Sequence, residues 1–400
     1  MSGLINLDSK IAIIGAGIGG LTLALALAKN GARDVHLYER RADAQELGAG
    51  IQIGPNAVRL LEHLGLAEGL RAISVTSPTG SMFEGKTHSK LTELPMDVHA
   101  MQHYGAHSYQ VLRADLHRLL LDATSDAFGQ NPVQFSKELV GLSHGQQPNI
   151  AFADGTEEAV DLVVGADGVE SNVRSSLFEH SATTYSGYYA WRGLLKTDLS
   201  SSYKTVDRLN VWVDAGRHLI AYPVGVDGKW INLVGVSESP DWHPENAVEE
   251  RPVSEWLEDY SGWNPQALGL IEGLERCQKW SLRTMPVMNR WHLGSVGLLG
   301  DAAHPMLPSL AQGAAQAIED AVCLAGLISA GELSVDALFS TYYDRRNVRV
   351  ARVQAASHWN LKFFHRPHTM MAKLQNIGMK ATGGLASRII AKKYRWLYGD

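Results

Sequence analysis

The order of apolar and polar positions predicts an α/β start to the chain. A short β-branched run at Lys10–Ile14 is followed by a Leu- and Ala-rich stretch at Ile18–Asn30 and a second strand-like run at Asp34–Tyr38. Strand, helix and strand in this order predict a βαβ unit with parallel strands and a right-handed crossover. Two further helices are predicted over Asn56–Leu64 and Arg113–Ala123, the first between a leading proline and a closing glycine.

The pattern changes in the middle of the chain. Short strand-like runs there alternate with Gly, Asp and Ser turns, which predicts an antiparallel sheet. The runs are Tyr188–Leu194, Leu209–Val213, His218–Val224 and Trp230–Val234. A buried strand at Ser295–Leu299, a long helix over Ala311–Ala330 and a helical tail from Val335 follow. The parallel part of the chain is therefore expected to be discontinuous, with the antiparallel sheet inserted into it.

Composition narrows the class of protein. The 36 Lys and Arg against 42 Asp and Glu give a formal charge of −6, which does not favour nucleic acid as a partner. Cys277 and Cys323 lie far apart and predict buried thiols in a reducing cytoplasm. Ile11–Ala28 contains no charge, but its four glycines argue against one continuous helix, so no membrane span is expected. Basic residues in Lys373–Arg395 are interpreted as the solvated face of a closing helix rather than a membrane-surface helix.

The first candidate site is a glycine-rich turn after the first strand. Gly15, Gly17 and Gly20 fill the pattern GxGxxG, and Glu39 lies 19 residues after Gly20, at the end of the second strand. Glycine allows a tight turn, a close approach of the backbone to a pyrophosphate and close helix packing, and a helix N-terminus favours phosphate. A carboxylate at the position of Glu39 accepts hydrogen bonds from an unphosphorylated ribose, which favours FAD or NAD over NADP.

Two later motifs distinguish FAD from NAD. A buried strand over Asp161–Gly165 runs into Asp167 and Gly168, and a second strand runs into Gly300 and Asp301. Both motifs place a carboxylate at the end of a strand, where open α/β sheets bind their ligands. The second motif also leads to a helix start, where backbone N–H groups can stabilise negative charge on a reduced isoalloxazine ring.

These motifs, in this order and at these spacings, resemble those of the group A flavoprotein hydroxylases, typified by para-hydroxybenzoate hydroxylase. Other segments are closer to the branch that contains salicylate hydroxylase, 3-hydroxybenzoate 6-hydroxylase and 6-hydroxynicotinate 3-monooxygenase. These segments are 48–56, 113–117, 185–193, 304–313 and 396–400. The resemblance covers almost the whole chain. It implies an α/β fold with a Rossmann-like FAD-binding domain, an inserted antiparallel-sheet substrate domain and C-terminal helices.

The resemblance also implies a domain division and roles for particular residues. The division is residues 1–74, 100–181 and 276–350 for the FAD-binding domain, 75–99 and 182–275 for the substrate domain, and 351–400 for a C-terminal helical segment. The expected cofactor contacts are Gly15, Gly17, Gly20, Glu39, Arg40, Arg113, Asp167, Gly168, Asp301, Gly313 and Ala314. Glu39 would hold the adenosine ribose, Arg113 the FAD linker, and Asp301 the ribityl or pyrophosphate region. Gly313 and Ala314 would present N–H groups to the flavin, while Asp167 and Gly168 would serve FAD and NADH or NADPH together.

On the substrate side, the best candidate pair is His218 and Tyr222. Their spacing of four on a predicted strand puts both on one face. A histidine and a tyrosine with this spacing line the pocket in 3-hydroxybenzoate 6-hydroxylase and 6-hydroxynicotinate hydroxylase. Oxygen transfer is faster onto a phenolate, and a neutral imidazole can accept the phenol proton near pH 7. A core histidine with a satisfied hydrogen bond is the alternative.

Arg192, Gln52 and Pro308 complete the expected substrate contacts. Pro308 follows the salicylate-like pattern, where the 3-hydroxybenzoate enzyme has glutamine after His-Pro. Gln52 stands where the 6-hydroxynicotinate enzyme has histidine. Both positions favour a salicylate-type acid, and an N-heteroaromatic such as a hydroxynicotinate is the alternative substrate.

The leading hypothesis is therefore an oxygenase of small phenolic or aromatic acids. NAD(P)H would reduce FAD, O2 would form a flavin C4a-hydroperoxide, and one oxygen would pass to the ring. A reductase, dehydrogenase or halogenase on the same scaffold, and a non-catalytic flavin redox sensor, stay open, as does the choice between monomer and homodimer. The GxSxG match at Gly141–Gly145 leads into a turn rather than a helix, which argues against a hydrolase. His99, His103 and His107 are spaced by four but lack a zinc motif, so no metal is expected.

Overall fold

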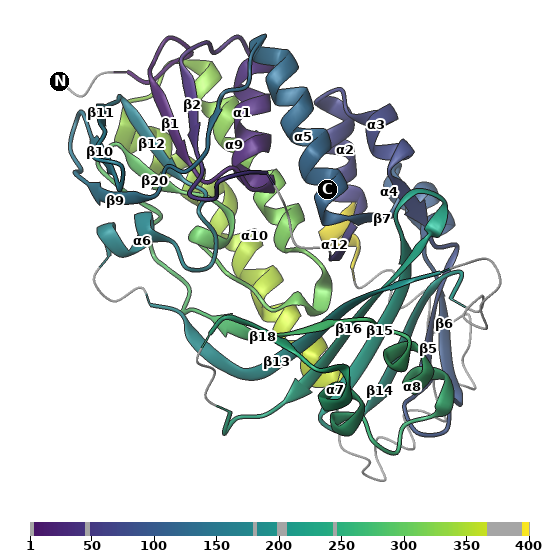
Figure 1. Cartoon of the computed structure of the whole chain (residues 1–400). Helices are drawn as coiled ribbons and strands as arrows, with labels where there is room; N and C mark the ends of the chain where they lie inside the picture. Colours follow the sequence, from purple (N-terminus) through teal and green to yellow (C-terminus); the bar gives the residue numbers. More distant parts are fainter. Residues whose placement is uncertain are drawn as a thin grey trace.

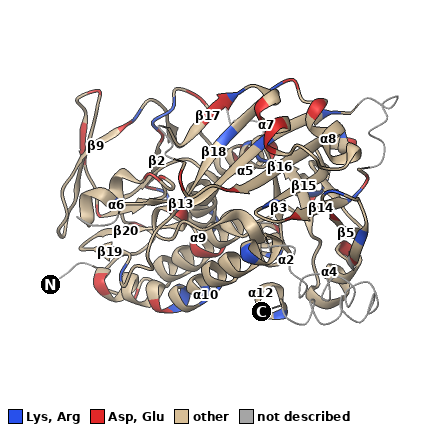
Figure 2. Cartoon of the chain, turned by 90° about the horizontal axis from the view of Figure 1, so that it is seen from below, with Lys and Arg blue, Asp and Glu red and all other residues tan. Residues whose placement is uncertain are grey.

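The computed structural model describes residues 4–44, 49–178, 182–197, 206–242, 246–365 and 394–399. Figure 1 shows two parts. The upper part is a mainly parallel sheet with helices beside it, and the lower part is a large twisted sheet. One long helix, α10 (Val335–Phe364), runs from the upper part down onto the lower sheet. Lys and Arg are interspersed with Asp and Glu over both parts (Figure 2). The α/β class and the two-part architecture expected from the sequence are confirmed.

The upper part is built on the predicted βαβ unit. β1 (Ile11–Ile14) lies between β12 (Leu162–Gly165) and β2 (Val35–Tyr38) and is parallel to both. The six strands follow the order β19-β20-β12-β1-β2-β8, with β19 alone antiparallel. The outer strands are β8 (Val133–Gln134), β19 (His292–Leu293) and β20 (Val296–Leu298). The carboxyl ends of β1, β12 and β20 consequently meet at one edge of the sheet.

Helices cover this sheet. α1 (Ile18–Lys29) packs against both α5 (Arg113–Phe128) and α9 (Gly313–Ala330), while α2 (Pro55–His63) and α3 (Ala67–Ala72) lie beside them. α5 runs beyond the predicted end at Ala123 and stops at the left-handed Gly129. α9 starts two residues later than predicted because Ala311 has a left-handed backbone, with φ of 52°. In the described residues α9 is the one helix long and apolar enough to cross a membrane, but more than half of it is buried in the protein.

The lower part is an eight-stranded sheet in the order β17-β18-β13-β16-β15-β14-β5-β6. All its neighbours are antiparallel except the parallel pair β14 and β5. The strands are β5 (Thr79–Glu84), β6 (Lys90–Pro95), β13 (Thr184–Lys196), β14 (Leu209–Asp214), β15 (Arg217–Val224), β16 (Trp230–Glu238), β17 (Val248–Arg251) and β18 (Cys277–Thr284). β18 continues this sheet past residue 276, where the sequence placed the return to the FAD-binding part. The domain division itself stays a prediction.

One face of the eight-stranded sheet has its own apolar core. α7 (Val253–Asp259) and α8 (Pro265–Glu272) cover this face. The core between the sheet and these helices contains aromatic residues from both, among them Trp191, Trp256 and Tyr260. The opposite face packs against Leu307 and against Leu361 of α10. This second face looks toward the upper part of the molecule.

Two small sheets and several helices complete the fold. β3 (Gly50–Ile53), β7 (Tyr109–Leu112) and β4 (Ser74–Thr76) form one short sheet, and β9 (Leu139–Leu142), β10 (Asn149–Phe152) and β11 (Glu157–Ala159) form another. The remaining described helices include α4 (Asp97–Tyr104), α6 (Asn172–Leu177) and α12 (Arg395–Tyr398). The expected helical segment after residue 351 is seen in α10 and α12, whereas almost all of the basic stretch Lys373–Arg395 lies outside the described residues.

Candidate active site

The glycine-rich turn after β1 is as tight as the sequence predicted. Gly15 has φ of +104°, and a Cβ added there would lie 2.5 Å from the carbonyl oxygen of Ala166. A Cβ on Gly20 would lie 2.0 Å from the oxygen of Gly15. At Gly17, by contrast, nothing lies within 4 Å of an added Cβ. Two glycines therefore serve the packing of the chain itself, while Gly17 borders open space in front of the helix start, as a pyrophosphate requires.

Glu39 lies directly after β2 and is buried, with its carboxylate turned back onto the glycine turn. One oxygen accepts the N–H of Ala16 at 3.1 Å, and the other accepts the backbone N–H and Nε of Arg41 at 3.0 and 3.2 Å. A carboxylate has about four acceptor positions, so capacity remains for a ribose hydroxyl. Arg40 beside it is exposed.

The Asp167-Gly168 element lies against the same turn. The Asp167 carboxylate accepts the hydroxyl of Ser171 at 2.5 Å and the N–H of Val173 at 3.1 Å, which fixes the start of α6. Burial raises the pKa of Asp167, and these two donors oppose the rise. Gly168 has φ of +79° and nothing within 4 Å of an added Cβ. The carboxylate thus holds its own loop, and its predicted service to FAD and NAD(P)H stays a prediction.

A buried arginine connects this element to the third strand-end turn. Arg174 donates to the carbonyl oxygens of Val169 and Ala302, at 2.6 and 3.0 Å. Arg174 follows the Asp167-Gly168 motif in the sequence. In the structure it ties the Asp167 loop to η2 (Gly300–Ala302), which carries Asp301.

Asp301 faces the start of α9. Its Oδ1 lies 3.9 Å from where a Cβ on Gly313 would be. Burial raises the pKa of Asp301, while His304, Arg113 and Arg174 oppose the rise. A carboxylate beside an N-terminal helix turn without a side-chain cap suits a ligand whose hydroxyl groups donate to the carboxylate and whose anionic part meets the helix N–H groups. Asp301 therefore lies close to Gly313, and Ala314 is the next residue of α9, while their contacts with FAD stay a prediction.

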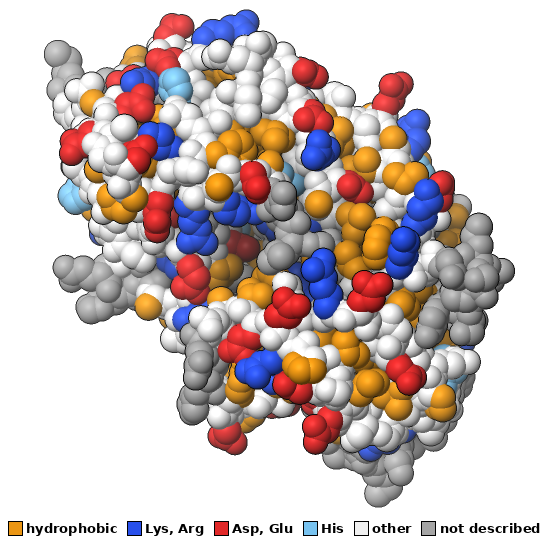
Figure 3. Space-filling view, in the orientation of Figure 1, with side chains coloured by type: hydrophobic (Ala, Val, Ile, Leu, Met, Phe, Trp, Pro, Cys, Tyr) orange, Lys and Arg blue, Asp and Glu red, His pale blue; other side chains and the backbone are white. Residues whose placement is uncertain are grey.

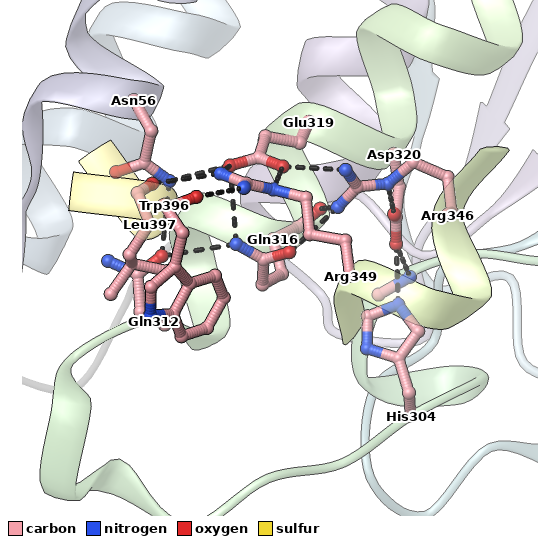
Figure 4. A network of polar contacts seen from close by, with 11 residues as sticks. Asn56, His304, Gln312, Gln316, Glu319, Asp320, Arg346, Arg349, Trp396 and Leu397 are labelled. Carbon is pink, nitrogen blue, oxygen red and sulfur yellow. Dashed lines mark hydrogen bonds and ion pairs between the residues drawn. The ribbon is translucent and has the colours of Figure 1, made fainter. Parts of the chain in front are cut away.

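A network of buried charges holds this helix start in place (Figure 4). Asp320 of α9 accepts the N–H of Gly300 at 3.1 Å, binds the His304 ring at 2.6 Å and pairs with Arg346 at 2.6 Å. Glu319, the next residue, accepts hydrogen bonds from four side chains. The four are Asn56, Gln316, Arg346 and Arg349. The sequence did not single out this network.

The C-terminal segment joins the same network. Arg349 donates to the carbonyl oxygens of Trp396 and Leu397, each at 2.8 Å, and the Tyr398 ring lies against Gly54. In the sequence, residues 396–400 stood out only because they resemble the flavoprotein hydroxylase branch. In the structure these residues contact the start of α2 and, through Arg349 and Glu319, the helix α9.

On the lower side, the face of the sheet that looks upward carries the substrate candidates in rows. His218 pairs with Val236, Ile220 with Val234, and Tyr222 with Asn232 across β15 and β16. Arg192 on β13 continues the middle row through its pairing with Val234. Side chains on alternate positions share a face, so His218 and Tyr222 lie on one surface, as their spacing predicted, and the strand pairing puts Arg192 on the same surface.

Arg192 and Tyr222 form a buried polar group. The Nε of Arg192 is buried without a hydrogen-bond partner in the described residues, and its guanidinium stacks 4.7 Å from the Trp280 ring centre. Burial lowers the pKa of Arg192, and Tyr222 opposes that change. Burial raises the pKa of Tyr222, and Arg192, Gln52 and Asn232 oppose the rise. Gln52 is thus placed beside Tyr222.

Asn232 is a further member that sequence reasoning missed. Its Oδ1 accepts the N–H of Gly50 at 2.7 Å, while its Nδ2 is buried without a partner among the described residues. A Cβ on Gly50 would lie 2.5 Å from Asn232, so the flavin-side strand β3 touches the substrate sheet here. An apolar strand pattern gave no separate signal for this asparagine.

His218 lies apart from this group. It is 1% exposed, and its Nδ1 is 2.7 Å from Nε2 of His365 at the end of α10. Four residues of strand separate it from Tyr222 by about 13 Å, at ~3.3 Å per residue. The two side chains can therefore touch one small molecule only at its opposite ends. Pro308 begins a short helical turn that packs on α10, next to Leu307 on the sheet face.

The GxSxG match and the three histidines spaced by four lie outside the candidate site. Ser143 lies in the turn between β9 and β10, with no helix after it. His99 and His103 stand on α4 with their rings 4.1 Å apart, while His107 lies past the helix and contacts Asp97. Among the residues that the structure describes, no group of three His, Cys, Asp or Glu side chains is arranged to hold a metal.

Known proteins are similar to this chain over almost its whole length. A family model described as an FAD binding domain matches residues 8–357. The chain belongs to this family of FAD-binding proteins. A 3-amino-4-hydroxybenzoate 2-monooxygenase of Streptomyces platensis is 33% identical over 100% of this chain and 98% of its own length. A 6-hydroxynicotinate 3-monooxygenase of Bordetella bronchiseptica is 34% identical over 88% of this chain and 91% of its own.

The fold is shared with solved flavoproteins. An FAD complex of a Klebsiella pneumoniae HpxO variant superposes with a TM-score of 0.84 at 24% identity, covering 98% of this chain and 99% of that one. At this identity the likeness shows the fold alone. Proteins named 3-hydroxybenzoate 6-hydroxylase and salicylate hydroxylase also match almost the whole chain, which confirms the branch inferred from the motifs. The protein is an FAD-dependent, NAD(P)H-using monooxygenase of aromatic compounds, and the reductase, halogenase and sensor alternatives are not favoured.

Proposed function

We propose that this monooxygenase hydroxylates a small aromatic acid that carries a ring hydroxyl, of the salicylate type. The observation that carries the proposal is the guanidinium of the half-buried Arg192, whose Nε is buried without a partner in the described residues, in a layer that faces the flavin-side turns. A buried cation needs an anionic partner, and a carboxylate fits a guanidinium by two parallel hydrogen bonds. The relatives named above act on hydroxylated aromatic carboxylates, which is the chemistry that this arginine would select.

The orientation of the acid follows from the rows on the sheet. Arg192 lies in the row between those of His218 and Tyr222. The carboxylate would bind Arg192 with the amide of Asn232 nearby, and the ring hydroxyl would point toward His218. His218 would accept the phenol proton and leave an electron-rich ring, while Tyr222 and Gln52 would hold the other edge.

The flavin-side residues fit an FAD. Gly15, Gly17 and Gly20 would admit the pyrophosphate, Glu39 and Arg40 would serve the adenosine end, and Arg113 would bind the linker. Asp301 would bind the ribityl or pyrophosphate region, and the N–H groups of Gly313 and Ala314 would face the ring. Asp167 and Gly168 would border both FAD and NADH or NADPH. FAD, reduced by the nicotinamide, supplies the oxygen activation; the chain binds and orients the acid and excludes water.

A hydroxynicotinate is the second candidate substrate, since a 34% identical relative is named for it. Gln52 beside Tyr222 distinguishes the two candidates. A pyridine ring nitrogen needs a donor in the pocket, and the glutamine amide can donate as well as accept. Turnover of salicylate against 6-hydroxynicotinate, in the wild type and in Gln52→Leu, would separate them.

The test of the function measures NADH oxidation and O2 uptake by the purified holoenzyme with a panel of aromatic acids. Acid-stimulated uptake with little peroxide release and a hydroxylated product is expected. Replacing His218 with alanine is expected to lower turnover and change its pH profile. A colourless protein that takes up no FAD would overturn the whole proposal, and an unchanged His218→Ala variant would overturn the role of that residue.

We further propose a cytoplasmic location and leave a homodimer open. The two free thiols support a reducing compartment, although Cys323 is half-buried rather than buried like Cys277. Light scattering of the holoenzyme would decide the oligomeric state.

A further inference from the structure

The contact between His218 and His365 joins two elements that are 147 residues apart in sequence. Nδ1 of His218, on β15, lies 2.7 Å from Nε2 of His365, the residue that ends α10. The rings are buried, and their centres are 4.9 Å apart. The Nδ1 of His365 is buried without a partner among the described residues. The strand pattern of the sequence pointed to His218 alone, and neither histidine is among the residues assigned to the flavin side.

A hydrogen bond between two imidazoles ties their protonation states together. Burial lowers the pKa of His218 well below its usual range, with His365 adding to the effect. Burial, with Arg217, lowers the pKa of His365 to about 4. Both rings are therefore neutral near pH 7, and a single proton lies between the two facing nitrogens. If His218 Nδ1 carries that proton, His218 Nε2 presents a lone pair and can act as a base.

We propose that His365 is a positioning residue that keeps His218 in its basic tautomer and accepts a proton from it when the substrate ionises. The inference rests on the proposed function, because His218 must meet the ring hydroxyl. The phenol proton passes to Nε2 of His218, and the Nδ1 proton of His218 passes to Nε2 of His365. The products are a phenolate, a neutral His218 and an imidazolium at His365, so charge and protons balance.

The place of His365 suits this charge. It ends a helix of 30 residues, and the last carbonyl groups of a helix favour a cation. The groups around the pair are Arg217 on β15, which disfavours the cation, the Tyr188 ring on β13 at 5.6 Å, and the Phe364 ring. The hydroxyl of Tyr260 donates to the carbonyl oxygen of His218 at 2.8 Å and holds the strand in place. The phenolate itself compensates the new positive charge across the pair.

The test reads the ionisation of a bound phenol directly. The probe is 4-hydroxy-3-nitrobenzoate, whose phenolate absorbs visible light, titrated with pH on the FAD-loaded enzyme. In His365→Phe the apparent pKa of the bound probe is expected to rise by about one unit, because a hydrogen bond to a charged group is lost. His365→Gln retains a hydrogen-bonding group but cannot take the proton. It is expected to keep a near-normal KM for the aromatic acid while losing kcat and the wild-type pH profile.

Two controls separate the possible failures. Phe364→Leu removes packing against the His218 ring, at 5.0 Å, without removing a proton acceptor, and is expected to leave the probe unshifted. If His218→Gln leaves the probe and turnover unchanged, the base assigned in the proposed function is wrong. If His218→Gln shifts them but folded, flavin-loaded His365→Phe does not, the inference about His365 is overturned and the proposed function stands. If the probe does not bind, the pH dependence of kcat/KM for the aromatic acid that is turned over decides between the same outcomes.

Discussion

The flavin side and the substrate side of this protein are built in different ways. On the flavin side, the groups offered to a ligand are mostly backbone: a glycine turn, an uncapped helix start and a loop that Arg174 secures. On the substrate side they are side chains at alternate positions of strands β13, β15 and β16. A backbone site tolerates little change in residue size, whereas a side-chain site can change its ligand by single substitutions. Different substrates can therefore share one flavin scaffold.

The largest effect is expected on the flavin side, from substitutions in its glycine turn. Gly20→Ala would put a Cβ 2.0 Å from the oxygen of Gly15, so the chain is expected to lose stability and FAD together. Gly17→Ala meets nothing within 4 Å and is expected to fold while binding FAD more weakly. Thermal unfolding without FAD and titration with FAD would measure the two effects. Equal apo stability of the two variants would contradict this division of roles.

The second largest effect is expected on the substrate side, where Arg192 is replaced. Arg192→Met is expected to raise KM for an aromatic acid about 100-fold and to leave FAD binding unchanged, because a buried charge pair is lost. Steady-state kinetics would show it, with the matching phenol that lacks a carboxylate as the control substrate. Arg192→Lys keeps the positive charge but loses the two-pronged guanidinium, so its KM should lie between those of the wild type and Arg192→Met. A similar loss for the acid and the plain phenol would mean that Arg192 does not bind the carboxylate.

A smaller effect is expected when low pH protonates Asp320, a member of the buried charge network around α9, and so lowers the free energy of unfolding. Burial alone would raise the pKa of Asp320, but His304 and Arg346 hold it at about 2, below the ordinary value of 3.8. A carboxyl group with a lowered folded-state pKa stabilises above its unfolded pKa, and that stability is lost as pH falls from 3.8 through about 2. The wild type should lose about 2 kcal/mol over this range that Asp320→Asn does not lose. Urea unfolding of both proteins across the range would check it, and parallel curves would contradict it.

The smallest effect concerns Arg40. Its side chain is exposed, whereas the neighbouring Glu39 is buried against the glycine turn. Arg40→Ala is expected to change the FAD dissociation constant less than about fivefold, as for exposed charges, and less at high salt. Glu39→Ala is the comparison and should cost more. Fluorescence titration at two salt concentrations would test the order, and a larger loss from Arg40→Ala would reverse it.

The same contrast explains how far the sequence could predict the site. Gly15, Gly17, Gly20, Asp167 and Asp301 follow strands in local motifs, so their convergence was predictable from the order of elements. Asn232 and His365 were not, because their neighbours come from strands and helices far away in sequence. The pairing of β18 with β13 and β17 was not predictable either, since an isolated strand pattern does not say which sheet it joins. Arg346 and Arg349 lie on a helix whose polar pattern resembles a solvated face, and only packing against α9 shows that Arg346 is buried.

Figure 3 shows acidic and basic side chains mixed over one face of the molecule rather than gathered into a patch of one sign. The two halves of the site are therefore not held together by an excess of opposite charge on that face. They meet instead at local contacts such as Gly50 on Asn232 and Leu307 on the sheet.

The contact of Gly50 with Asn232 limits how this enzyme can be re-engineered by recombination. A chimera that takes the antiparallel insert from a relative receives the residue at position 232, while the residue at position 50 stays with the recipient. A recipient with a bulkier residue at position 50, or a donor insert with a shorter residue at position 232, would disrupt this contact, however well each piece folds alone. Crossover libraries should therefore inherit the two positions as a unit.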